Sequence, residues 1–151
     1  MAANRVIVTA GDCVLKKEHR LASAGGASPG TFVMPVAGGV AVAAAGYARQ
    51  IAILDYSSEF GLETKPPEGG KAYAEGDLVP ILYPAAGCEV NAAADTSGGG
   101  IADGDLLAIA EGGMLKKPAP GEEAAAIAIA RESVAIVPGT PAKVKAEILR
   151  Q

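Results

Sequence analysis

The stretch "YAEGDLVPILY" (residues 73–83) returns in the same chain as "IADGDLLAIAE" (residues 101–111). In both copies an acidic residue precedes Gly-Asp, and a strand-length run of mainly apolar residues follows. Glycine allows a tight turn, and an aspartate side chain can accept hydrogen bonds from nearby backbone amides where a strand begins. An abbreviated copy, "AGDCVL", occupies residues 10–15. The repeated phrase therefore predicts turns that lead into β-strands.

Short apolar runs separated by turn residues continue along the chain, which is typical of a barrel or a sandwich. In "AKVKAEIL" the residues alternate strictly, so Val144, Ala146 and Ile148 are expected to face inward. Pro80 cannot donate to a ladder, which predicts an edge or a bulge for its strand. Residues 40–54 are rich in alanine and also fit a helix. The predicted strands are residues 5–10, 31–36, 40–46, 49–56, 78–83, 106–111, 124–132 and 142–149.

The pattern indicates a mostly β protein, with a small β-barrel or sandwich domain at residues 21–151 and an extended N-terminal arm at residues 1–20. The chain has 151 residues, and its apolar content comes from 32 Ala with only 2 Phe, 4 Tyr and no Trp. Small side chains bury little area each, so the core is thin for the length of the chain. Association with a partner or with copies of itself would add stability.

The net charge of −4 is uneven. Residues 1–50 carry five bases and two acids, whereas residues 51–110 carry two bases and ten acids. The acidic middle argues against a nucleic-acid-binding surface. The basic cluster "LKKEHR" could dock on an acidic partner or could be an ordinary solvated segment. No apolar run approaches the length of a membrane helix, and the N-terminus lacks the pattern of a signal peptide.

No motif in the sequence indicates catalysis, a cofactor or a metal. His19 is the one histidine and stands among charged residues, and neither a GxSxG motif nor a P-loop occurs. The spacing of Asp95, Asp103 and Asp105 does not match a calcium-binding loop. The isolated Cys13 and Cys88 are expected to be buried, reduced side chains. We therefore expect no enzyme activity, no cofactor and no metal.

An alternative function concerns the segment "GGMLKKP" at residues 112–118. Carrier domains of the biotinyl and lipoyl type are small β structures that present a modifiable lysine in a tight hairpin. Lys116 or Lys117 would be that lysine here. Biotinyl domains have the lysine between two methionines, and this chain has Met-Leu-Lys-Lys instead.

The order of the phrases resembles the head-decoration proteins of tailed bacteriophages, also called capsid cement proteins. The similarity covers about residues 21–149, and "YAEGDLV" and "IADGDLLAIAEGGMLKK" contribute most of it. The other phrases that match in order are "SPGTFVM", "AGGVAVAA", "IAILD", "GCEVNAAAD", "AIAIARES" and "AKVKAEIL".

This resemblance implies a structural virion protein that is made in the host cytoplasm and binds the outer surface of an assembled capsid. Such proteins commonly act as trimers and clamp neighbouring major capsid subunits together. A different virion protein, such as a tail or head-fibre component, would share the β architecture and the lack of catalysis, and only its position on the particle would distinguish it. The expected partners are the major capsid protein and further copies of the chain, with no nucleic acid and no membrane. The basic and strand-forming N-terminus is the expected capsid contact, with the residues Arg5, Val6, Ile7, Val8, Lys16, Lys17 and Arg20.

Overall fold

The computed structural model describes residues 7–10, 14–55, 72–97 and 99–150. These residues form eleven strands and two 3-10 turns, so the prediction of a mostly β protein is confirmed. Residues 40–54 form strands and a turn instead of a helix. No helix among the described residues is long and apolar enough to cross a membrane. The elements are β1 (Val8–Ala10), β2 (Val14–Arg20), β3 (Phe32–Val36), β4 (Gly39–Val42), β5 (Ala52–Leu54), β6 (Leu78–Pro84), β7 (Glu89–Ala94), β8 (Leu106–Ile109), η2 (Glu111–Gly113), β9 (Leu115–Lys116), η3 (Glu123–Ala125), β10 (Ala128–Ala130) and β11 (Ala142–Ile148).

Six strands form one sheet in the order β1-β7-β11-β10-β8-β9. A parallel pairing of β9 with β7, at Leu115 and Ala94, joins five of these strands into a closed barrel. In β11, Val144, Ala146 and Ile148 are buried, as the alternation predicted. Strand β1 pairs with β7 at Val90 and Glu89, on the side of β7 opposite β11.

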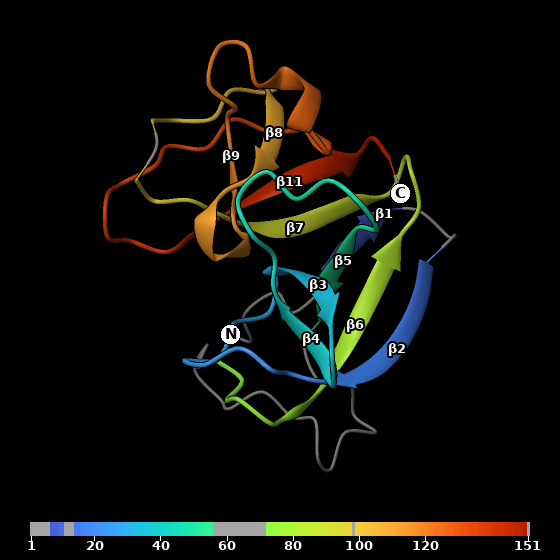
Figure 1. The fold of residues 1–151 in the computed structure, drawn as a ribbon. Coiled ribbons are helices and arrows are strands. Elements are labelled where there is room, and N and C mark those ends of the chain that lie inside the picture. Colours follow the sequence, from blue (N-terminus) through green and yellow to red (C-terminus); the bar gives the residue numbers. More distant parts are fainter. Residues whose placement is uncertain (1–6, 11–13, 56–71, 98, 151) are drawn as a thin grey trace, which may run out of the picture.

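The other five strands form a second sheet in the order β2-β6-β5-β3-β4. Figure 1 shows this sheet beside the barrel that contains β7 and β11. A parallel bridge between Leu21 and Val40 brings the ends of β2 and β4 together. Gly39 is required at this junction because a Cβ atom there would lie 2.0 Å from the carbonyl oxygen of Arg20.

Alternation along the second sheet divides its side chains between two cores. Phe32, Ile53 and Leu82 lie opposite one another in the register and join the core of the barrel. Their neighbours Val33, Leu54 and Ile81 point the other way, into a second core. Because successive side chains of a strand face opposite sides, three short strands can supply both cores.

The two copies of the repeated phrase adopt the same local structure. In the first, the Asp77 N–H donates to the Ala74 carbonyl at 3.1 Å, and in the second the Asp105 N–H donates to the Ala102 carbonyl at 3.0 Å. The third residue of each turn is a glycine at positive φ, with 88° at Gly76 and 91° at Gly104. Strands β6 and β8 begin directly after these turns. The phrase is thus a turn that starts a strand, and residues 11–13 of the third copy lie outside the described residues.

The expectation that Pro80 marks an edge or a bulge was wrong, because β6 lies between β2 and β5. The carbonyl of Pro80 accepts the Asp55 N–H at 3.0 Å, so the main chain of Pro80 faces β5. Strand β5 ends at Leu54, and the buried Tyr73 hydroxyl donates to the Asp55 carbonyl at 2.9 Å. The Tyr73 hydroxyl therefore gives the Asp55 carbonyl the hydrogen bond that the missing N–H of Pro80 cannot donate.

The described part of the predicted N-terminal arm lies in the two sheets. Ile7 is 1% exposed and belongs to the barrel core, and its carbonyl accepts the Asn91 N–H at 2.6 Å. Residues 14–20 form β2, which pairs along its full length with β6. In this conformation these segments do not extend away from the domain, because their backbone groups pair with β7 and β6. The division of the chain at residue 20 stays a prediction.

Candidate binding surface

The aspartates of the repeated phrase are held as caps of their turns. The Asp77 carboxylate accepts the Ala74 N–H at 2.8 Å, and the Asp105 carboxylate accepts the Ala102 N–H at 2.8 Å. The hydrogen bond from Ala102 lowers the pKa of Asp105, and the Lys117 ammonium, 3.4 Å away, lowers it further. Both carboxylates already have structural partners.

Two further aspartates were considered as calcium ligands, and the structure places them in separate local settings. The Asp95 carboxylate accepts both the N–H and the hydroxyl of Ser97. Asp103 is exposed, and its N–H donates to the Ser133 hydroxyl at 3.0 Å. Over the described part of the chain, no three His, Cys, Asp or Glu residues are grouped so that they could hold a metal ion.

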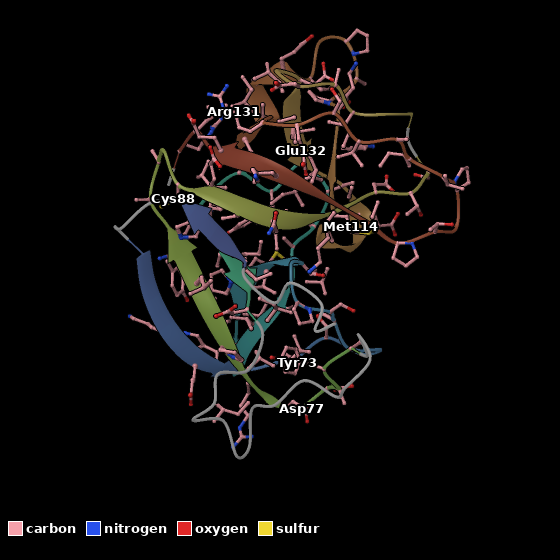
Figure 2. The ribbon with its side chains drawn as sticks, turned by 180° about the vertical axis from the view of Figure 1, so that it is seen from behind. Tyr73, Asp77, Cys88, Met114, Arg131 and Glu132 are labelled. Carbon is pink, nitrogen blue, oxygen red and sulfur yellow. The ribbon has the colours of Figure 1, made fainter. Side chains whose placement is uncertain are left out.

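A half-open cavity of about 720 Å³ lies where the two sheets meet. Its walls are mostly small residues, and Met114, which Figure 2 labels, also lines it. Glu111 is the one ionisable side chain among the described residues that line this cavity. The Ser23 hydroxyl on its wall accepts the Val42 N–H at 2.7 Å. The cavity wall therefore presents no paired acid and base for chemistry.

The two lysines of the carrier alternative lie in or after β9. Lys116 pairs with Ala108 of β8, and Lys117 follows with an ion pair to Asp105. The tip of this connection is η2, which spans Glu111–Gly113 and contains no lysine. A carrier domain presents its lysine at the tip of a hairpin, so this geometry does not favour that function.

The structure separates the predicted capsid-contact residues into different places. Arg5 and Val6 lie outside the described residues. Ile7 is buried, and Val8 lies in β1 of the barrel sheet. A contact through the Ile7 side chain would require this residue to leave the barrel core.

Lys16, Lys17 and Arg20, by contrast, belong to one strand. All three lie in β2, where Lys17 and Arg20 are exposed. The Arg20 guanidinium donates to the Gly76 carbonyl at 3.2 Å, which holds it beside the first repeated turn. Figure 2 shows Tyr73 and Asp77 at this end of the molecule, far from Arg131 and Glu132.

Tyr83 of β6 and His19 of β2 were not among the predicted site residues. The Tyr83 hydroxyl lies 3.3 Å from Nε2 of His19, and both side chains are half-buried. Burial raises the pKa of Tyr83, and the nearby Tyr47 raises it further. Burial also raises the pKa of Tyr47. Both tyrosines stay neutral at physiological pH, and no spacing in the sequence signals that Tyr83 reaches His19.

Comparisons of the sequence and the structure with known proteins do not assign the chain to a family. No protein-family model and no curated protein matches the chain. One solved structure that is similar is the head fiber gp8.5 N base of bacteriophage phi29, at 17% sequence identity. The match covers 91% of this chain and 99% of that chain with a TM-score of 0.45. A TM-score of this size does not establish a shared fold.

Proposed function

We propose that the protein is a structural virion protein without enzymatic activity, which binds the outer surface of an assembled phage capsid. It stabilises the capsid by clamping neighbouring major capsid subunits, and it acts as a homotrimer. The observation that carries this proposal is the shared hydrogen bonding of the two repeated phrases. The order of these phrases resembles capsid cement proteins, and in both phrases the Asp carboxylate is a turn cap beside the backbone it supports.

A β body whose buried side chains form two hydrophobic cores is suited to a binding role of this kind. Contacts that are weak singly become strong when they repeat across a shell, because one bound subunit holds the next contact at high effective concentration. A trimer presents the same surface three times and multiplies this effect. Stabilisation then follows from mass action, since the protein binds the closed shell and not the separated subunits.

The test is co-sedimentation of the purified protein with expanded shells assembled from the major capsid protein of its own virus. The expected result is saturable binding at a fixed number of copies per shell and a higher temperature of shell disruption. The matched control is the same protein after thermal unfolding, which should stay in the supernatant. A folded protein that fails to sediment with shells at high concentration would overturn the proposal.

The homotrimer is tested separately by sedimentation velocity of the free protein over a range of concentrations. A species with about three times the mass of the chain is expected to grow with concentration. A monomer at every concentration, with shell binding intact, would remove the trimer and leave the capsid role.

A further inference from the structure

Strand β2 is the first strand of the five-stranded sheet and pairs with β6 on one side. On its other side, β4 approaches only at the end of β2, where Leu21 bridges Val40 and the Ala22 N–H donates to the Val40 carbonyl at 2.7 Å. Among the described residues, no strand pairs with this outer side from Val14 to Arg20. An open strand edge is a template for main-chain pairing with another chain.

The orientation of Pro80 in β6 shows which main-chain groups of β2 face outward. Glu18 lies opposite Pro80, and the Pro80 main chain faces β5, where its carbonyl accepts the Asp55 N–H. In an antiparallel ladder, two opposite residues either exchange both hydrogen bonds or point away from each other. The N–H and carbonyl of Glu18 therefore point away from β6, to the open side.

The residues that follow β2 confirm this alternation of main-chain direction independently. Leu21 exchanges hydrogen bonds with the Gly76–Asp77 turn, so it faces β6, whereas Ala22 faces β4. Counting back in steps of two, Arg20, Glu18 and Lys16 have their main-chain groups on the outer side. The Arg20 carbonyl is covered by Gly39, which leaves Lys16 and Glu18 at the open part of the edge.

The charges along β2 select the kind of strand that fits this edge. Lys17 and Arg20 are exposed, Lys16 belongs to the same strand, and Glu18 is its one acid. Charged residues on an edge prevent pairing with apolar strands. An extended segment that carries acidic side chains would gain main-chain hydrogen bonds and charge pairs together.

We infer that the outer edge of β2 is a strand-addition site, at which an extended acidic segment of the capsid protein pairs with residues 14–18. This inference deepens the proposed function and rests on it. The addition would extend the five-stranded sheet by one strand.

A proline at Glu18 tests the site, because the lost N–H faces outward and the pairing with β6 does not use it. Glu18→Pro should weaken binding to expanded shells at least tenfold, since it removes one donor and obstructs the incoming strand. Glu18→Ala keeps the N–H and removes the one acid, so its affinity should equal or exceed that of the unmodified protein. Equal shell binding by the proline and alanine variants would overturn the strand-addition site and leave the capsid role standing.

Hydrogen exchange on the unmodified protein provides a second measurement if Glu18→Pro does not fold. The amides of Lys16 and Glu18 should exchange quickly in the free protein and become protected at least tenfold on shells. Unchanged exchange at both amides in protein that is bound to shells would contradict the site. A protein that does not bind shells at all would remove the proposed function and this inference with it.

Discussion

Substitution of two neighbouring glycines tests the junction at which the ends of β2 and β4 meet. Gly38 lies between β3 and β4, Gly39 is the first residue of β4, and both have positive φ, 83° and 155°. A Cβ atom at Gly38 would meet nothing within 4 Å, whereas at Gly39 it would lie 2.0 Å from the Arg20 carbonyl oxygen. The pair therefore separates backbone strain from steric exclusion.

The two substitutions should differ clearly in magnitude. Gly38→Ala should lower the free energy of unfolding only by the cost of positive φ in a residue that has a Cβ atom, about 1–2 kcal/mol. Gly39→Ala has the same backbone cost and also forces the Arg20 carbonyl away from β4. This movement breaks the hydrogen bond from the Ala22 N–H to the Val40 carbonyl, a loss of about 1 kcal/mol. It also loosens the packing of Leu21 and Val40, which are 1% and 2% exposed, and full burial of such side chains contributes about 1.5–3 kcal/mol each. If the loosening costs about a third of that burial energy, the total for Gly39→Ala is about 3–5 kcal/mol.

The assay is thermal unfolding followed by circular dichroism, with scanning calorimetry to establish two-state behaviour. One kcal/mol corresponds to about 2–4 °C in a protein of this size, so Gly38→Ala should lower the Tm by about 2–8 °C and Gly39→Ala by about 6–20 °C. Equal Tm values for the two variants would refute the reasoning, because they would mean that β4 does not meet the end of β2 at Gly39.

Three further predictions concern single side chains. Tyr73→Phe should destabilise the fold by about 1 kcal/mol, measured by urea unfolding, because the hydroxyl that donates to the Asp55 carbonyl is lost; an unchanged midpoint would contradict this role. The pKa of Asp105 is lowered from its ordinary value of 3.8, so its stabilising contribution is present above that pH and is lost as the pH falls through the lower folded-state pKa. Asp105→Asn should therefore reduce the acid sensitivity of unfolding in this range, and a pH profile identical to that of an Asp103→Asn control would contradict the turn cap. Intact-mass spectrometry of protein from its native source should show unmodified Lys116 and Lys117, and a biotinyl or lipoyl mass increment would favour the carrier function instead.

Much of the fold could be predicted because alternation and turn chemistry act locally. The Gly-Asp phrases, the inward face of β11 and the strands around Phe32 and Leu107 all follow from periods of two and from residues suited to tight turns. The strand at Val14–Arg20 was missed because four charged residues and a histidine hide its alternation, and only pairing with β6 makes it a strand.

The candidate site was less accessible to sequence reasoning than the fold. Strand β6 pairs with β2 and β5, which are distant from it in sequence, and the Tyr73 hydroxyl reaches the Asp55 carbonyl at the point where Pro80 has no N–H. The outward direction of Glu18 depends in turn on that arrangement. No local pattern around residues 14–20 contains this information, so the open edge of β2 emerged only from the sheet order.

The most direct test of the capsid role is electron cryomicroscopy of expanded shells mixed with the purified protein. The account predicts added density at fixed positions on the outer surface, bridging neighbouring capsid subunits, with β2 at the contact. Bare shells at saturating protein concentration, or density that is confined to a tail, would contradict it.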